Sequence, residues 1–244
     1  IGKFFPAAQL GFYTKAKQFQ RMASENVSGA IGNVAFPVYS KLQDDKEQLK
    51  NAMRKFMQHS LIFIVPILVM LIVIAKPFVI ILLKEKWAPM IPYLQLLCIV
   101  GVFYPINMVN IQAITAQGKG RLSFKLNLVR NALRIINIFV MYRYGVIYII
   151  LGEVIVSLIA VFINTWFIKR YVDYSLWKQS KDIWQIMLGG LIAGFFGFIP
   201  SLFYSNLWIL GITGILITSA FFLGTQYLIN YKLLNEAIKL RKYF

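Results

Sequence analysis

The sequence predicts an all-α protein that crosses a membrane several times. Of its 244 residues, 59% are hydrophobic and 14% are charged, whereas a soluble domain carries roughly 25% charged residues. The mean hydropathy is +0.65. Hydrophobic residues also fall in successive blocks about as long as the roughly 20 residues that an α-helix needs to cross a bilayer. Composition and pattern together exclude an ordinary soluble globular core.

Seven hydrophobic segments are separated by short polar connections, so we expect a transmembrane helical bundle of about seven spans. The first and the fourth are the least apolar. The segments are Ala7–Tyr39, Ser60–Leu83, Met90–Thr115, Leu122–Tyr142, Val146–Ile168, Ile183–Tyr204 and Leu207–Ile229.

The connections carry signals for helix ends and tight turns. Asp44, with Glu47 three residues later, has the spacing of a capping box and predicts a helix start after the first segment. Gly118 and Gly120 are expected to separate the third segment from the fourth, and Gly145 to make the turn into the fifth. Connections of this length leave no room for a soluble domain.

Basic residues are distributed unevenly between the two sets of loops. One set contains Lys41, Lys46, Lys50, Arg54, Lys55, Lys119, Arg121, Lys169, Arg170, Lys178, Lys181, Lys232, Lys239, Arg241 and Lys242, and the other contains Lys84, Lys86 and Arg143. Such asymmetry predicts that the first set and the C-terminus are cytoplasmic. It also explains most of the net charge of +17 without a nucleic-acid partner.

Two further patterns concern the surfaces of the helices. Aromatic residues expected near the membrane interfaces are Trp87, Tyr104, Trp177, Trp184 and Trp208. Small-residue faces that allow helices to approach closely are expected from Gly189, Gly190, Gly194, Gly197, Gly211, Gly214 and Gly224.

The fourth segment carries a polar face inside the membrane. Its members recur at spacings of three and four and are Asn127, Arg130, Asn131, Arg134 and Asn137. A charged side chain at the bilayer centre costs about 3 kcal/mol, so this face predicts a watery cavity or an anionic partner. Alternatively, the arginines snorkel to the cytoplasmic surface; Arg130 lies roughly 12 Å and Arg134 roughly 18 Å along the helix from Leu122.

The first segment repeats this theme, with a polar face formed by Thr14, Lys17, Gln18, Arg21, Glu25 and Ser28. Arg21 and Glu25 can simply pair with each other as neighbours four residues apart. Lys17 still leaves the face net positive.

Glu153 is the one acidic residue of the last four segments, and Asn164 follows it by eleven residues on the same helical face. Such a carboxylate either pairs with an arginine or couples an ion. No stretch resembles a metal-binding cluster, a nucleophile triad or a phosphate loop, so we expect no metal, cofactor or catalytic residue.

Four stretches, in this order and spacing, resemble the polysaccharide-transporter or O-antigen flippase family. This family lies within the superfamily that also contains drug and lipid-linked-precursor exporters (the Wzx-like branch of the MOP, or MATE-related, superfamily). The stretches are LGFYTKA at 10–16, FPVYSKLQDD at 36–45, KWAP at 86–89 with PYLQLL at 92–97, and AQGKGR at 116–121. One departure is Lys84, where relatives tend to have glycine.

The resemblance implies one lobe of a two-lobed transporter with fourteen spans, of which the seven segments correspond to spans 8–14. The expected organisation is a C-lobe bundle over 1–168, a basic cytoplasmic loop over 169–182, two additional spans over 183–230 and a basic cytoplasmic tail over 231–244. The expected partners are lipid-linked oligosaccharide, membrane lipids and the missing N-terminal lobe. The expected location is the bacterial inner membrane.

The function that the resemblance implies is transport of lipid-linked oligosaccharide across that membrane by alternating access. Its substrate, a glycan on polyprenyl pyrophosphate, would meet a cationic cavity lined by Lys17, Arg21, Arg130 and Arg134. Polar lining residues would be Gln18, Glu25, Asn127, Asn131 and Glu153.

Two other functions remain open. A drug or cation exporter of the same superfamily would share the fold, but cationic cargo favours carboxylates over the basic faces found here. A membrane-embedded glycan polymerase or ligase would need a substantial extracytoplasmic loop or a catalytic constellation.

Overall fold

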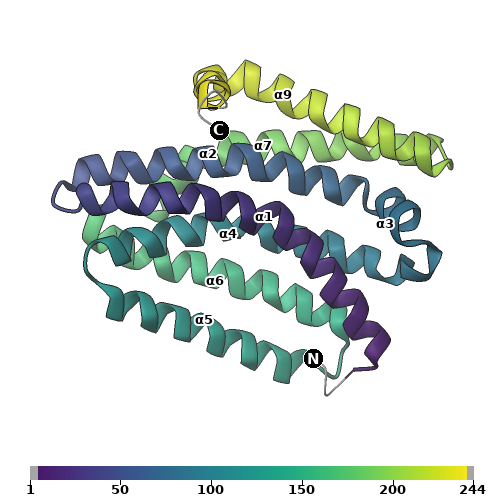
Figure 1. Ribbon diagram of the computed structural model, residues 1–244, viewed down its shortest axis with the longest axis horizontal. Coiled ribbons are helices and arrows are strands. Elements are labelled where there is room, and N and C mark those ends of the chain that lie inside the picture. Colours follow the sequence, from purple (N-terminus) through teal and green to yellow (C-terminus); the bar gives the residue numbers. More distant parts are fainter. Residues whose placement is uncertain (1–4, 241–244) are drawn as a thin grey trace.

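The computed structural model describes residues 5–240, and helices form almost all of this part of the chain. Seven long helices lie side by side and alternate in direction (Figure 1). They are α1 (Ala7–Lys41), α2 (Lys46–Val73), α4 (Ile91–Ala116), α5 (Gly120–Met141), α6 (Val146–Val172), α7 (Leu176–Phe198) and α9 (Leu207–Leu240); shorter elements are α3 (Ala75–Leu83), the 3-10 helix η1 (Glu85–Met90) and α8 (Pro200–Phe203).

The long helices coincide with the seven predicted segments, and the all-α membrane fold is confirmed. Five of them are long and apolar enough to cross a membrane: α2, α4 with η1, α6, α7 with α8, and α9. The helices α1 and α5 have 35 and 22 residues but carry the polar faces noted above. The count of seven spans therefore stays a prediction.

Two expected boundaries are wrong in detail. Asp45, not Asp44, caps α2, because its carboxylate accepts the backbone N–H groups of Glu47 and Gln48 at 3.0 and 2.9 Å. The expected loop over 169–182 shrinks to the three residues between Val172 and Leu176, since both neighbouring helices continue into it.

Four turns of the described residues have a positive φ, which favours glycine, at Lys84, Gly118, Gly145 and Asp173. Gly118 and Gly145 have φ angles of +72° and +109°, which confirms the two predicted glycine turns. Lys84, between α3 and η1, has φ 74° and ψ 167°, a region that residues with a Cβ avoid. This backbone gives a physical reason for glycine at the corresponding position of the family pattern.

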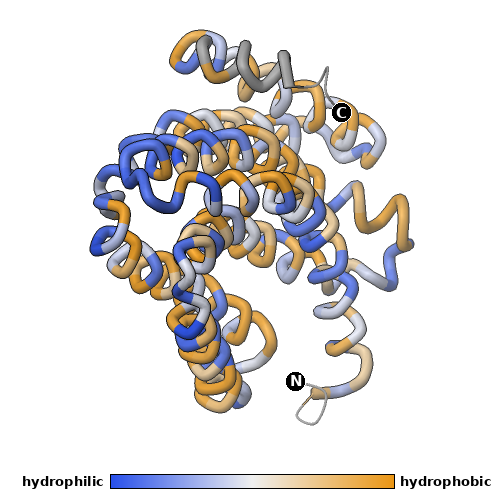
Figure 2. Tube along the Cα trace, turned by 60° about the vertical axis from the view of Figure 1, so that its left-hand side comes forward, coloured by the Kyte–Doolittle hydropathy of each residue, from blue (hydrophilic) through white to orange (hydrophobic). Residues whose placement is uncertain are grey.

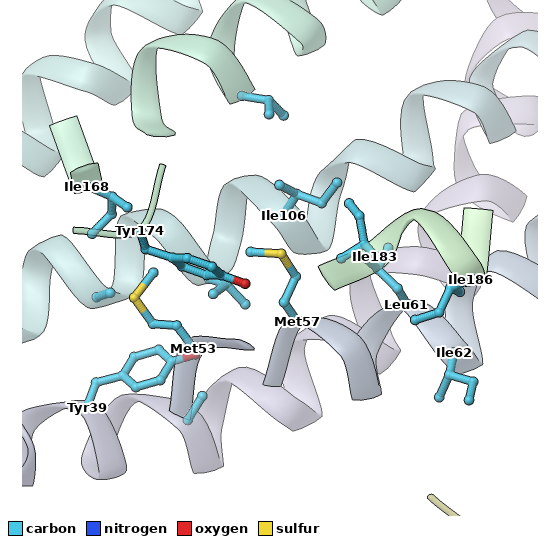
Figure 3. Close-up of a cluster of buried hydrophobic side chains, with 14 of the residues drawn as sticks. Tyr39, Met53, Met57, Leu61, Ile62, Ile106, Ile168, Tyr174, Ile183 and Ile186 are labelled. Carbon is cyan, nitrogen blue, oxygen red and sulfur yellow. The ribbon is translucent and has the colours of Figure 1, made fainter. Parts of the chain in front are cut away.

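The helices pack through two hydrophobic clusters. One lies toward the α1–α2 turn and gathers side chains of α1, α2, α4, α6 and α7 (Figure 3): Tyr39, Met53, Met57, Leu61, Ile62, Ile106, Ile168, Tyr174, Ile183 and Ile186. The second joins α2, α3, α4 and the start of α6 and includes Leu68, Val79, Leu94, Leu97, Val146 and Ile150. Together they bury the inner faces of α2 and α4 and fix the frame on which α1, α5 and α6 are placed.

Glycines let α7 lie close to both of its neighbours. A Cβ at Gly190 would come within 2.5 Å of Val65 on α2, and one at Gly197 would collide with Thr218 on α9. A Cβ at Gly214 on α9 would lie 2.9 Å from the Ile74 side chain. The predicted small-residue packing is confirmed at these positions, whereas Gly224 faces open space.

Large apolar side chains cover the outside of the bundle. Phe162, Leu191, Phe195 and Leu216 expose between 61% and 73% of their surface, as expected of side chains that meet lipid. The exposed tryptophans Trp177 and Trp208 lie at helix starts, in agreement with the prediction, whereas Trp184 is exposed but lies more than two turns inside α7. Tyr104 is a further exception, because it lies at the middle of α4 and faces a pocket inside the bundle.

The most basic loops meet at one end of the bundle. The α1–α2, α4–α5 and α6–α7 turns lie together there, while the α3–η1 and α5–α6 turns lie at the opposite end (Figure 1). Figure 2 brings the first end forward and shows hydrophilic residues gathered on it. Of the predicted C-terminal cations, Lys232 and Lys239 belong to α9 but their side chains are not among those described, and Arg241 and Lys242 lie outside residues 5–240.

Candidate functional site

A pocket inside the bundle is lined by residues of the four helices α1, α4, α5 and α6. Its volume is about 50 Å³, enough for one or two water molecules. The charged lining residues are Lys17, Glu25, Arg130, Arg134 and Glu153; the polar and apolar ones are Gln20, Val100, Gly101, Phe103, Tyr104, Asn107 and Ser157. Three helices, α1, α5 and α6, thus bring five charged side chains together, and α4 supplies polar and apolar ones.

Glu153 is the buried anion at the centre of this site. Its residue surface is 6% exposed, and its carboxylate lies 3.4 Å from Nζ of Lys17 and 3.7 Å from a terminal nitrogen of Arg134. The Tyr13 hydroxyl contacts the second carboxylate oxygen at 3.4 Å and accepts a hydrogen bond from Lys17 at 2.9 Å. A single carboxylate therefore serves two cations, which leaves this cluster with a net positive charge.

The two arginines of α5 have hydrogen-bonding capacity to spare. A terminal nitrogen of Arg130 donates to Asn127 at 2.9 Å. Among the described residues, Nε of Arg130 and Nε of Arg134 are buried and have no hydrogen-bond partner. A buried donor without a partner costs about 1–3 kcal/mol, so an acceptor that enters the pocket would relieve that cost.

Arg21 and Glu25 form the neighbouring pair that the sequence allowed, with Nε of Arg21 2.8 Å from the carboxylate. Arg21 does not line the small pocket. It lies instead on an open groove of about 430 Å³ on α1, which it shares with Lys17, Gln18 and Glu25. Lys17 and Glu25 border both hollows, so the outer groove and the inner pocket are neighbours along α1.

The position of the charged groups along the helices can be worked out from the helix rise. Arg134 lies roughly 21 Å from the start of α5 at Gly120, and Glu153 roughly 11 Å from the start of α6 at Val146. Since α5 and α6 run in opposite directions, both side chains lie at similar depth. The contacts with Glu153 explain how Arg134 stays at that depth instead of reaching for the nearer helix end.

The remaining predicted residues have separate positions. Asn127 bonds within its own helix to Ser123 O at 3.1 Å, and Gln18 accepts a hydrogen bond from Lys15 at 3.2 Å. Asn131 is exposed on α5 and is absent from the pocket lining. The expected single polar face of α5 is therefore too wide, because only part of it turns toward α1.

Asn137 and Asn164 support the helix packing beside the site. Asn137 donates to Ile149 O on α6 at 2.9 Å, and Asn164 donates to Asn107 on α4 at 2.8 Å. These bonds tie α5 and α4 to α6, the helix that carries Glu153.

Sequence reasoning did not assign Tyr13, Gln20, Tyr104, Asn107 or Ser157 to the site. Tyr13 precedes Lys17 by four residues, so the helical spacing itself places them side by side. For Tyr104 and Asn107, three residues apart inside an apolar segment, the same spacing was available as a signal. Ser157 follows Glu153 by four residues in the same way.

Comparison with known proteins gives matches along most of the chain. The family described as "Polysaccharide biosynthesis protein" matches residues 1–92. Over 180 residues the chain is 28% identical to the lipopolysaccharide biosynthesis protein WzxC of Escherichia coli K12, which covers 73% of this chain and 37% of WzxC. It is 26% identical over 124 residues to the teichuronic acid biosynthesis protein TuaB of Bacillus subtilis 168, which covers 51% of this chain and 26% of TuaB.

A solved structure of the lipid II flippase MurJ, in an inward closed conformation, has the same fold with a TM-score of 0.76 at 18% identity. The similarity covers 93% of this chain and 48% of that flippase chain. The chain thus spans about half of MurJ and between a quarter and two fifths of these curated relatives. The family match over residues 1–92 and the relatives agree in kind, so the chain is similar to polysaccharide biosynthesis proteins and has the all-helical fold of about half of the MurJ chain.

Proposed function

We propose that the chain forms one lobe of a transporter that moves lipid-linked oligosaccharide across the bacterial inner membrane. The observation that carries this proposal is the meeting of Lys17, Arg130 and Arg134 in one pocket inside the bundle, where Lys17 and Arg134 contact the carboxylate of Glu153. The relatives named above act in lipopolysaccharide and teichuronic acid biosynthesis, and the structural neighbour is a lipid II flippase. Both kinds of evidence point to the same class of cargo.

The electrostatics of the site suit a diphosphate. Lys17, Arg21, Arg130 and Arg134 face the two carboxylates of Glu25 and Glu153, so the groove and the pocket together carry a formal net charge of +2. A diphosphate that links a lipid to a sugar carries roughly two negative charges at neutral pH, and its oxygens accept charge-assisted hydrogen bonds. The free Nε groups of the two arginines are suitable donors for it.

In this proposal Glu153 is an internal counter-ion that the cargo replaces. Without cargo, Glu153 keeps Lys17 and Arg134 inside the membrane at an acceptable energy, since intramembrane charges are stable when paired. When a phosphate oxygen takes over these cations, the contacts of 3.4 and 3.7 Å are long enough to yield to shorter ones. Glycan hydroxyls would meet Gln18, Asn127 and Asn131 on the neighbouring exposed surfaces.

The pocket of about 50 Å³ is too small for an oligosaccharide, so the cargo must lie largely outside this lobe. We propose that the exposed faces of α1 and α5 border a larger cavity between this lobe and the N-terminal lobe. Rocking of one lobe against the other would open that cavity alternately to each side, as in other transporters with two repeats. The basic end of the bundle and the C-terminus would be cytoplasmic by the positive-inside rule.

A drug or cation exporter of the same superfamily is the weaker alternative, because the site has more cations than carboxylates. An enzyme that polymerises or ligates glycans is weaker still: the described outer turns are short, and we propose that the protein does no covalent chemistry. Product formation by the purified protein, as opposed to movement of labelled cargo, would decide for the enzyme.

The proposal is tested by a flipping assay on the full-length gene product with Arg134→Ala. Loss of one charge-assisted hydrogen bond to a phosphate should slow transport about tenfold to a hundredfold at unchanged protein abundance. Lys125→Ala is the matched control, since Lys125 is an exposed cation on the same helix outside the pocket, and this variant should keep at least half of the activity. Unchanged transport by Arg134→Ala removes Arg134 from the mechanism.

A further inference from the structure

A second cationic hollow lies at the basic end of the bundle, far from the site described above. It has a volume of about 340 Å³ and is bordered by the α1–α2 turn, the α4–α5 turn and the end of α6. The charged residues at its border are Lys46, Lys119, Arg170 and Asp44. Three cations from three separate segments thus face one carboxylate, so the hollow is net positive.

These three cations differ from the other basic residues of the same end. In the neighbouring hollow, Arg54 pairs with Asp182 at 3.0 Å and Lys178 pairs with Asp173 at 2.7 Å. Among the described side chains, those of residues 5–231 and 233, no ion pair joins Lys46, Lys119 or Arg170 to a carboxylate. The protein therefore neutralises one group of cations internally and leaves the other group facing its hollow.

A glycine turn and an aromatic ring position Lys119 in the hollow. Gly118, with φ +72°, reverses the chain between α4 and α5 and presents Lys119 beside α6. Nζ of Lys119 lies 3.2 Å from the centroid of the Tyr171 ring, a cation–π contact. Desolvation, and then repulsion by Lys46 and Arg170, lowers the pKa of Lys119 below its ordinary value. An anion bound among these groups would remove that repulsion.

We propose that this hollow binds the phosphate of an anionic phospholipid headgroup. Ammonium and guanidinium groups are the usual phosphate ligands of proteins, and the hollow lies where the helices α4 and α6 end and α5 begins. Basic pockets between transmembrane helices at that level bind anionic headgroups. A free phosphate in solution has the same chemistry, but it lacks the acyl chains that would rest on the apolar outer surface of the bundle.

The test uses the purified chain in detergent and measures retention of added phosphatidylglycerol and of phosphatidylethanolamine by native mass spectrometry. The unmodified protein should retain phosphatidylglycerol in preference. Lys119→Gln with Arg170→Gln should weaken this retention by roughly thirtyfold, since each basic group near an anionic surface contributes about a factor of five. Lys178→Gln, in the internally paired group, should have little effect.

Three results would overturn the proposal. Unchanged phosphatidylglycerol retention by the double variant, with the melting temperature also unchanged, excludes the hollow as the site. An equal loss in Lys178→Gln shows a general charge effect. Displacement of the lipid by millimolar inorganic phosphate, or equally tight binding of inorganic phosphate alone, assigns the hollow to a soluble anion. A variant that lowers the melting temperature is replaced by Lys46→Gln, which removes a cation from the exposed start of α2, and the same criteria apply.

Discussion

The contact between Lys17 and Glu153 should appear as a coupling energy in a double-mutant cycle. Coulomb's law with an effective dielectric constant of about 20 gives a ceiling of about 5 kcal/mol for charges 3.4 Å apart. The Lys17 side chain is 35% exposed and that of Glu153 8%, so screening removes much of this energy. We expect a coupling of about 1–2 kcal/mol.

The cycle compares Lys17→Met, Glu153→Gln and the double variant by the free energy of unfolding in mixed detergent micelles. Glu153→Gln alone should destabilise more than Lys17→Met, because it leaves both Lys17 and Arg134 without their counter-ion. A second cycle with Arg134→Met should give a smaller coupling of about 1 kcal/mol, since that contact is 3.7 Å long and the Arg134 side chain 40% exposed.

Lys15 supplies the control for both cycles. It lies on the same helix but contacts Gln18 and the Phe19 ring, so its coupling to Glu153 should be within about 0.3 kcal/mol of zero. If Lys17 and Glu153 prove additive to the same precision, the reasoning that makes Glu153 the counter-ion of the site is wrong.

Two further predictions concern the turns that hold the helices in place. Lys84→Gly should stabilise the protein by about 1 kcal/mol in the same unfolding assay, because it removes the strain of a positive φ at a residue with a Cβ. Lys86→Gly, inside η1, should not stabilise it. Equal effects of the two substitutions would show that the backbone at Lys84 is unstrained. Asp45→Ala should lower stability at neutral pH and reduce the loss of stability on acidification, while Asp44→Ala should do neither. The backbone N–H groups of Gln48 and Glu47 hold the pKa of Asp45 below its ordinary value. The contribution of Asp45 to stability is therefore present above about pH 4 and is lost as the pH falls through its folded-state pKa. The same acid dependence of stability in both alanine variants would contradict this cap.

Hydrophobic block length predicted the fold well, because a bilayer imposes nearly the same length on every spanning helix. The glycine turns at Gly118 and Gly145 were readable for a similar reason, since only glycine enters those conformations easily. The choice between Asp44 and Asp45 as helix cap was not, because adjacent carboxylates have the same propensity and the backbone geometry decides between them.

The sequence predicted which charged residues form the site, but not which of them contact one another across helices. Helical spacing placed Arg130 and Arg134 on one face, and the cost of intramembrane charge indicated a partner. That Glu153 serves both Lys17 and Arg134 depends on how α1, α5 and α6 are arranged, which spacing within a single helix does not encode. Asn131 lies on the same predicted stripe but is exposed outside the pocket, so its place in a cavity between the lobes stays a prediction.

The central claim is that Lys17, Arg130 and Arg134 are accessible to water inside the membrane and bind the phosphate groups of the cargo there. It is tested most directly by thiol labelling of Lys17→Cys in a Cys98→Ala background of the full-length gene product, with Phe162→Cys on the apolar outer surface as control. We predict that a charged anionic thiosulfonate labels position 17 rapidly, that it labels position 162 slowly, and that undecaprenyl diphosphate protects position 17. Absence of labelling at position 17, or labelling that the diphosphate lipid does not slow, would contradict the claim.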